Sequence, residues 1–372
     1  MSELKLQQCR VDGRYDVLEC LGRGSYSEVY VARDVVASNG GPQTVVLKAL
    51  NTHLQGEPDA ELEHTLIVNF RNEAIALDRV RHPQIISRLG HGTAIDLSGR
   101  TFHYLVLEYL SGGDLQALCR RKPLDLRDAL YFLEQVSNGL EHAHSRGVIH
   151  RDIKPQNLLL TADQRVVKIA DFGVAKLEAA DGAITRVGTD IYAAPEHHPL
   201  IQTGQLDTAS LAARNASQLT PAADVYSLAK TAYMLLTGEA PRRFSQRPVT
   251  EFPTPPAHEG WAAPVLRVLE RATQTNPSAR YQSVGEFWNE LRRAAGSTGE
   301  EFGDAREVAP LPHKSSRRAE EEQPAPARAP APAFERPVEP APSRPGGQDQ
   351  RIVIPIGQED ARPAPPRRDG HA

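Results

Sequence analysis

Two polar motifs in the middle of the chain most constrain what it can fold into. The first motif runs from His150 to Asn157 (HRDIKPQN), and the second, Asp171-Phe172-Gly173, begins fourteen residues after Asn157. Each motif borders a short apolar run that is typical of a buried strand. A solvated loop would explain the charges of the first motif, but it does not explain a matched second motif. The pair therefore indicates a functional site carried by short strands.

Two weaker signals lie closer to the N-terminus. A glycine-rich segment, Gly22 to Ser27 (GRGSYS), stands between two predicted strands, where glycines would let backbone N–H groups approach the phosphates of a nucleotide. Taken alone, this segment is better explained as a plain hairpin turn. Lys48 lies on the apolar run VVLK, and a single lysine on such a run is usually a surface residue that extends its stem over the sheet. Both signals gain weight only beside the two central motifs.

The predicted elements change character near Leu110. Before this point the chain has mostly strand patterns and one amphipathic helix, and beyond Gly113 it has helix patterns. Strands followed by helices predict an α+β protein with two lobes. The expected strands are 14–21, 29–33, 44–50, 85–92 and 101–109, and the expected helices are 62–80, 115–120, 126–145, 222–237, 263–272 and 284–294.

The ordered set of motifs resembles the eukaryotic-type Ser/Thr protein kinases, in particular their bacterial members. The resemblance covers about residues 14–295 and implies the two-lobed protein kinase fold, with a small, mainly β N-lobe at 14–109 and a larger, mainly α C-lobe at 110–295. One key helix belongs to the N-lobe. The matching residues are Gly22, Gly24, Lys48, Glu73, His150, Arg151, Asp152, Asn157, Asp171, Phe172, Gly173, Ala194, Pro195, Glu196, Asp224 and Arg280.

The resemblance implies the catalytic roles. Asp152 would accept or orient the proton of the substrate hydroxyl, and Lys154 would reach the transferred phosphate. Lys48 would contact the α- and β-phosphates of ATP and form an ion pair with Glu73. Lysine at position 154 is typical of the Ser/Thr class, so the expected reaction is transfer of the γ-phosphate of Mg-ATP to protein hydroxyls, including autophosphorylation of the activation loop.

The resemblance also places the cofactors. Asp171 and Asn157 would hold Mg²⁺, for which Mn²⁺ could substitute, because oxygen ligands suit a hard cation. Glu108 and Leu110 belong to the segment resembling the hinge between the lobes, whose backbone would bind the adenine edge. The full set of expected ATP contacts is Gly22, Gly24, Val29, Val46, Lys48, Glu108, Leu110, Asp114 and Leu159.

Residues 174–194 resemble an activation segment. Arg151 beside Asp152 is typical of kinases whose segment is ordered by phosphorylation, since a phosphate pairs with a nearby arginine. Thr185 is the main predicted phosphosite, although a plain solvated threonine is the alternative. Thr189, the second candidate, resembles the threonine that shapes the site around Asp152.

The stretch after Glu196 is longer than is usual in the family. Residues 197–218 are predicted to be a surface insertion that docks substrate, and its two histidines lack the companions that a metal site needs. Glu196 is expected to form a buried structural ion pair with Arg280. Asp224 is expected to hold the backbone of the catalytic loop.

Composition limits the partners. The chain has 43 Lys+Arg against 47 Asp+Glu, and this near balance argues against nucleic acid. Three cysteines without a C-x-x-C pair indicate reduced thiols. The start of the chain shows no signal peptide and no stretch is apolar enough to span a membrane, so we expect a cytoplasmic protein. Expected partners are protein substrates, a second copy for autophosphorylation, and a protein that binds the tail.

Two rival functions stay open. A pseudokinase that binds nucleotide as a scaffold is the main alternative, although every residue that handles metal, phosphate or proton is present. A small-molecule phosphotransferase is the other, although such enzymes generally lack an activation segment and the Ala194-Pro195-Glu196 motif.

Residues 296–372 are rich in Pro, Ala, Arg and Glu, and their composition predicts a disordered tail. Two P-x-x-P matches, at 337–340 and 342–345, fit a polyproline ligand but arise easily in such a tract. Ile352-Val353-Ile354, followed by Pro355-Ile356, is the apolar cluster of the tail. A short docking motif is one interpretation of this cluster, and a disordered end is the other.

Overall fold

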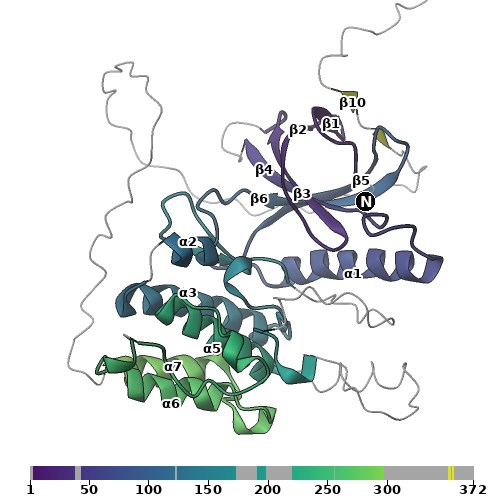
Figure 1. Cartoon of the computed structure of the whole chain (residues 1–372). Coiled ribbons are helices and arrows are strands. Elements are labelled where there is room, and N and C mark those ends of the chain that lie inside the picture. Colours follow the sequence, from purple (N-terminus) through teal and green to yellow (C-terminus); the bar gives the residue numbers. More distant parts are fainter. Residues whose placement is uncertain are drawn as a thin grey trace, which may run out of the picture.

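The computed structural model describes residues 3–37, 43–121, 124–172, 191–197, 220–254, 256–296, 351–352 and 354–355. A curved sheet with one long helix against it stands over a set of packed helices (Figure 1). The strands come mainly from the first third of the chain and the packed helices from the part beyond it. The predicted two-lobed α+β architecture is therefore confirmed.

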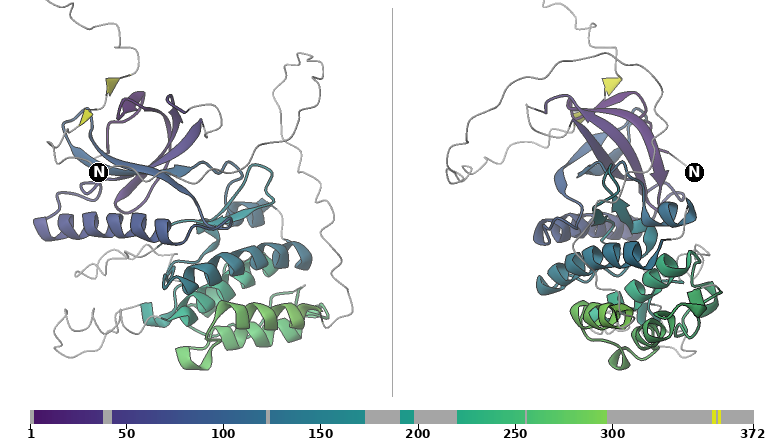
Figure 2. Two further views of the ribbon diagram at one scale, coloured as in Figure 1. Left: turned by 180° about the vertical axis from the view of Figure 1, so that it is seen from behind. Right: turned by 90° about the vertical axis from the view of Figure 1, so that its left-hand side faces the viewer.

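The N-lobe sheet has the strand order β10-β1-β2-β3-β4-β6-β5-β9. Neighbours from β10 to β5 are antiparallel, whereas β5 and β9 are parallel. The sheet curls around a core of its own, which includes Leu6, Val11, Tyr30 and Leu47 (Figure 2). The strands are β1 (Cys9–Val11), β2 (Tyr15–Arg23), β3 (Ser27–Asp34), β4 (Thr44–Leu50), β5 (Arg88–Ile95), β6 (Thr101–Glu108), β9 (Arg351–Ile352) and β10 (Ile354–Pro355).

Helix α1 (Ala60–Arg79) runs beneath the sheet in Figure 1. Its first turn is capped by Asp59, whose Oδ1 accepts a hydrogen bond from the Leu62 N–H at 2.7 Å. Phe70 and Leu77 lie seven residues apart on one face, and both are buried with Glu73. The apolar periodicity of the helix therefore turns the carboxylate of Glu73 toward the interior of the N-lobe.

The C-lobe is built around α5, in which every residue from Ala222 to Leu236 is buried. This helix begins at Pro221 and ends at Thr237, and it is followed by the capping residue Gly238, whose φ of 72° suits glycine. None of the helices in the described ranges has the length and apolar composition of a membrane span. The C-lobe helices are α2 (Leu115–Arg121), α3 (Leu126–Ser145), α5 (Pro221–Thr237), α6 (Ala262–Ala272) and α7 (Val284–Gly296), and β7 (Leu158–Leu160) pairs with β8 (Val167–Ile169). Short 3₁₀ turns lie at Pro155–Asn157, Pro195–His197, Arg242–Phe244, Pro256–His258 and Pro277–Ala279.

Most of the expected elements differ from the observed ones by only one or two residues at an end, but three differences are larger. The N-lobe begins before residue 14, because Leu4, Leu6 and Cys9 are buried in its core and β1 pairs with β2. The strand expected at 85–92 is displaced to Arg88–Ile95, since Ile85 makes only an isolated bridge to β8. Within the tail predicted to be disordered, 351–352 and 354–355 pair with the N-lobe sheet.

Lys230 is fully buried in the middle of α5. Its Nζ donates to the backbone oxygens of Phe244 and Arg247, the latter at 2.9 Å. The same nitrogen lies 5.1 Å from the centre of the Tyr226 ring. Burial lowers the pKa of Lys230 to about 7, because the charged ammonium loses its hydration.

This buried lysine predicts a pH dependence. Between about pH 7 and about pH 10 the unfolded chain keeps a proton on residue 230 that the folded chain has released, so stability should rise with pH. Lys230→Met should remove this slope, whereas the exposed Lys5→Met should keep it. Urea midpoints measured at about pH 7 and about pH 9 test the difference. Equal slopes in the wild type and in Lys230→Met would contradict it.

Candidate active site

The catalytic loop is held from below by Asp224 of α5. Its carboxylate accepts hydrogen bonds from the N–H groups of His150 and Arg151, at 2.7 and 2.8 Å, and from His144 Nε2 at 2.8 Å. Burial alone would raise the pKa of Asp224, but the hydrogen bonds from His144 and His150 keep it below its usual value. The predicted bracing by Asp224 is confirmed. His144 was not predicted, because a histidine in an amphipathic helix carries no sequence signal.

His150, the first residue of the first central motif, is fully buried and contacts the second motif. Its Nε2 donates to the Ala170 carbonyl at 3.0 Å, while its Nδ1 accepts from the Asp152 N–H at 3.2 Å. A ring that donates at one nitrogen and accepts at the other is neutral. Burial accordingly lowers the pKa of His150. The ring also packs against Phe172, with 4.6 Å between centroids, and so joins the two motifs.

Asp152, Lys154 and Asn157 lie together on the catalytic loop. Lys154 Nζ is 2.8 Å from Asp152 Oδ2. Asn157 Nδ2 donates to the backbone oxygen of Asp152 at 2.8 Å and to its Oδ2 at 3.1 Å. Since the amide nitrogen faces Asp152, the side-chain oxygen of Asn157 is its atom suited to a cation. The loop thus presents a carboxylate, an ammonium group and an amide oxygen at one place.

Lys48 connects the two lobes. Its Nζ lies 2.6 Å from Glu73 Oε1 on α1 and 2.8 Å from Asp171 Oδ1, which follows β8. Burial would lower the pKa of Lys48, but the two carboxylates raise it above its ordinary value. The positive charge of Lys48 in turn lowers the pKa of Asp171. The predicted Lys48–Glu73 ion pair is therefore present. Burial raises the pKa of Glu73, and the nearby charge of Lys48 opposes that rise.

Asp171 has an unusual backbone conformation. Its φ of 57° lies in the left-handed region, which is uncommon for a residue other than glycine. Phe172 is buried beneath it, whereas the Asp171 side chain is 56 % exposed. The strained turn after β8 thus buries the ring and leaves the carboxylate accessible.

The glycine-rich segment is the β2–β3 hairpin. The Gly24 N–H donates to the Ser27 carbonyl at 2.7 Å, and a Cβ at Gly24 would lie 2.7 Å from Ser27 Oγ. A side chain at position 24 would therefore have to displace the Ser27 hydroxyl, while Gly22 faces open space.

The expected adenine contacts lie on both lobes. Val46 is buried in the main core, and Val29 and Leu159 pack partly buried against it. The Glu108 side chain accepts from Lys168 Nζ at 2.8 Å and from the Ser87 N–H at 2.6 Å. This link between the hinge and β8 was not predicted, because single charges on strands carry no pairing signal. The roles expected for these residues stay predictions.

Two further expected contacts flank the hinge. Asp114 Oδ1 accepts from the Ala117 N–H at 2.7 Å, so this residue caps the start of α2. Leu110 is half-buried and packs against the main core. The proposed contacts of Leu110 with adenine and of Asp114 with ribose stay predictions.

The Glu196–Arg280 ion pair is confirmed. Arg280 is fully buried, and its two terminal nitrogens lie 2.6 and 2.8 Å from the Glu196 oxygens. It also donates to the backbone oxygens of Ala222, Gln274 and Thr275. The guanidinium thus ties the 3₁₀ turn at Pro195–His197 to α5 and to the loop after α6.

Several predicted features lie outside the described residues. These are Thr185, Thr189, most of the activation segment and the insertion beyond His197.

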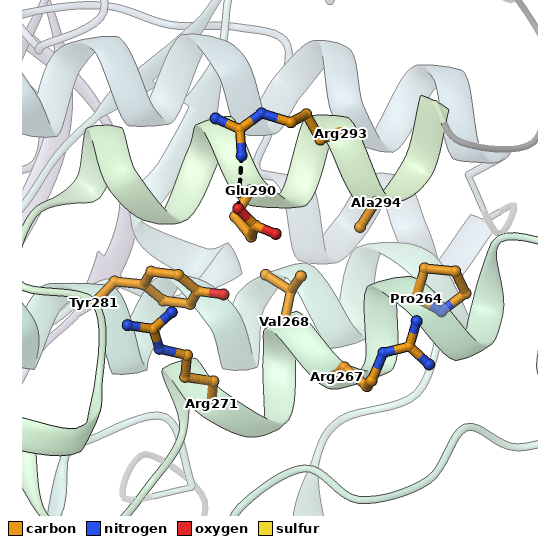
Figure 3. Close-up of a pocket in the computed structure, with 8 residues that line it drawn as sticks. All are labelled: Pro264, Arg267, Val268, Arg271, Tyr281, Glu290, Arg293 and Ala294. Carbon is orange, nitrogen blue, oxygen red and sulfur yellow. Dashed lines mark hydrogen bonds and ion pairs between the residues drawn. The ribbon is translucent and has the colours of Figure 1, made fainter.

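A groove between α6 and α7 lies apart from the catalytic loop (Figure 3). Three arginines line it, but Arg271 lies over the Tyr281 ring and Arg293 pairs with Glu290 at 2.7 Å. None of the predicted site residues lines this groove.

The protein kinase domain family model matches residues 15–258, more than half of the chain. The chain therefore belongs to the protein kinase domain family. It is 31% identical over 293 residues to serine/threonine-protein kinase PknB of Mycobacterium leprae, covering 75% of this chain and 43% of that protein. It is 32% identical over 331 residues to serine/threonine-protein kinase pkn3 of Myxococcus xanthus, covering 82% of this chain and 55% of that protein. The chain thus spans about half the length of these curated relatives.

A solved structure agrees with this assignment. The kinase domain of Mycobacterium tuberculosis PknI is 26% identical, with a TM-score of 0.55, covering 79% of this chain and all of that domain. Membership of the family implies ATP and a divalent metal ion.

The oxygen donors fit such an ion. Among the described residues no group of three or more His, Cys, Asp or Glu side chains could hold a metal without other ligands. The Asp171 carboxylate is accessible, and the Asn157 amide nitrogen is turned toward Asp152. Mg²⁺ in a nucleotide complex takes one or two oxygen ligands from the protein and others from the phosphates. The oxygens of Asp171 and Asn157 are suited to be these protein ligands.

Proposed function

We propose that the chain transfers the γ-phosphate of Mg-ATP to serine and threonine hydroxyls of proteins. The observation that carries the proposal is the double contact of Lys48 with Glu73 and Asp171. It brings a residue from the sheet, one from α1 and one from the C-lobe to a single point. The Ser/Thr kinases named above, which match both lobes, support the same reaction.

Phosphoryl transfer depends on positioning and on neutralising charge. Lys48 would bind the α- and β-phosphates, with Glu73 fixing its ammonium group. Asp171 and Asn157 would hold Mg²⁺, which when bound neutralises charge on the β- and γ-phosphates. Gly22 and Gly24 would let backbone N–H groups approach the phosphates from above.

The acceptor hydroxyl would meet Asp152. Its carboxylate would orient the hydroxyl and take its proton, and Asn157 holds the carboxylate in place through Oδ2. Lys154, 2.8 Å from the same oxygen, would contact the transferred phosphate and stabilise the charge that develops on it. The three groups thus divide proton acceptance, orientation and charge stabilisation.

Phosphorylation of the activation segment is part of the proposal. Arg151 Nε is buried and has no hydrogen-bond partner among the residues that the structure describes. A buried guanidinium nitrogen without a hydrogen-bond acceptor favours an anionic partner. A phosphate on Thr185 or Thr189 would supply such a partner. A second copy of the chain would act as the substrate in such autophosphorylation.

The main rival is a nucleotide-binding scaffold without turnover, and Asp152→Asn separates the two. The variant should lose phosphate transfer to protein by at least about 10²-fold, because the proton acceptor is gone. It should keep its ATP-dependent rise in melting temperature, since Asp152 is not a proposed nucleotide contact. A scaffold would show the same low transfer in both proteins, and that result would refute the proposal.

A further inference from the structure

Two short strands near the C-terminus, β9 and β10, pair with the two edges of the N-lobe sheet. Strand β10 lies antiparallel to β1, with Ile354 opposite Arg10 and Pro355 opposite Cys9. Strand β9 lies parallel to β5, with Arg351 opposite Ala94. Because β9 and β10 are separated by a single residue, one short segment carries both and closes the sheet on itself.

Strands β1 and β5 would otherwise be the two edges of this sheet. An edge strand presents a row of unpaired N–H and C=O groups, which makes it a template for another strand. The residues that meet the segment, Cys9 and Ala94, are fully buried in the N-lobe core. The pairing therefore involves residues of both edge strands that belong to this core. Figure 1 shows β10 next to β1.

The sequence of the segment suits this position. Ile352-Val353-Ile354 is a run of β-branched residues, which favour strands. Pro355 follows, and proline is tolerated at the end of a strand or at a sheet edge because it lacks an N–H. No other run of three β-branched apolar residues occurs between residue 296 and the C-terminus.

The length of the chain allows one molecule to supply the segment. Residues 297–350 connect the end of α7 to Arg351. A connection of that length reaches roughly 40 Å as a random coil and further when extended. Such a tether gives an effective concentration on the order of millimolar, enough for a short strand of modest affinity.

We propose that residues 351–355 are a docking strand, with which the chain closes its own N-lobe sheet between β1 and β5. The occupant of this edge is therefore the C-terminal part of the same molecule, and the mode of binding is β-strand addition.

The docked strand is connected to the glycine-rich hairpin. The segment before β1 places the Leu4 N–H 2.9 Å from Glu28 Oε1, and Glu28 lies on β3. The other Glu28 oxygen accepts from Tyr30 at 2.8 Å and pairs with Arg23 at 3.3 Å. The strand with which β10 pairs, β1, thus directly follows the N-terminal segment that contacts the base of the hairpin.

A disulfide tests the register. Cys9 lies opposite Pro355, and opposite residues in an antiparallel pair have Cα atoms about 4.5–5.5 Å apart, within the range for a disulfide. Pro355→Cys in the full chain should therefore form a bond with Cys9 under mild oxidation. Burial raises the pKa of the Cys9 thiol, so the reaction is run at about pH 8.5. Peptide mapping by mass spectrometry reads out the linked pair.

The controls are Pro363→Cys, another tail proline replaced outside the strand, and Pro355→Cys combined with Cys9→Ala. The expected result is a bond within one chain for Pro355→Cys, formed at least about tenfold faster than for Pro363→Cys. A bond between two chains would show that a second copy supplies the strand and would overturn the proposal. Equal rates for the two cysteine positions would overturn it as well.

Hydrogen exchange gives a second test that creates no new thiol. Ile352→Pro/Ile354→Pro should raise amide exchange in β1 and β5 by at least about tenfold, because the strand can no longer pair. Val308→Pro/Val338→Pro introduces two prolines elsewhere in the tail and should leave amide exchange in β1 and β5 unchanged. Exchange in β4 and α3 reports that the fold is intact. Unchanged exchange at both edges in the first variant would contradict the docking.

Discussion

Replacing Asp171 by Asn is expected to lower the rate of phosphoryl transfer by about 10³-fold or more, which corresponds to about 4 kcal/mol of transition-state stabilisation. Two effects add at this residue. The carboxylate is the accessible charged oxygen donor proposed for the metal, and a neutral amide binds Mg²⁺ more weakly. The same carboxylate lies 2.8 Å from Lys48 Nζ, so its loss also removes one of the two groups that position this ammonium.

Asp163→Asn is the matched control. Asp163 is an exposed carboxylate in the turn between β7 and β8, with hydrogen bonds to Thr161 and to the Arg165 N–H. The rate of phosphoryl transfer by the Asp163→Asn variant should stay within about twofold of the wild type, since an exposed turn residue contacts neither metal nor phosphate. Initial rates of ADP formation and of protein phosphorylation measure both variants. A rate for Asp171→Asn equal to that of Asp163→Asn would contradict the assignment of the metal site.

Replacing Arg280 by Met is expected to cost about 3–5 kcal/mol of stability, because it leaves Glu196 without its partner in a largely buried place. The guanidinium is fully buried and donates to three backbone oxygens in addition to Glu196. Methionine fills similar space but donates no hydrogen bond. For a domain of this size the melting temperature should fall by about 10 °C.

Arg293→Met provides the contrast. Arg293 and Glu290 form an exposed ion pair on α7, with side chains 73% and 46% exposed. Exposed pairs contribute less than about 1 kcal/mol, so the urea midpoint should hardly move. If Arg280→Met lost no more stability than Arg293→Met, Arg280 would not be the structural centre that its contacts indicate.

The sequence predicts most elements of the fold because the elements are long and periodic. The expected strand 44–50 and helix 126–145 match β4 and α3 at both ends. The Lys48–Glu73, Glu196–Arg280 and Asp224 interactions could be predicted because they belong to motifs with fixed order in the chain. A residue within such a motif is placed by its neighbours as well as by its own chemistry.

The contacts that could not be predicted belong to no motif with a fixed order in the chain. β1 is three residues long, too short for an apolar period to identify it. The β-branched run at 352–354 was visible, but its partners Arg10 and Ile95 lie hundreds of residues away. Both edges must first exist in the folded sheet before a strand can add to them, so local sequence does not encode this pairing.

The most direct test of the central claim is to incubate the purified full chain with Mg-ATP and map phosphorylated residues by tandem mass spectrometry, with Asp152→Asn treated in parallel. We expect phosphate on serine and threonine, including Thr185, in the wild type and essentially none in the variant. Phosphate on neither protein, or equal phosphorylation of both, would contradict the assignment of this chain as an active Ser/Thr kinase.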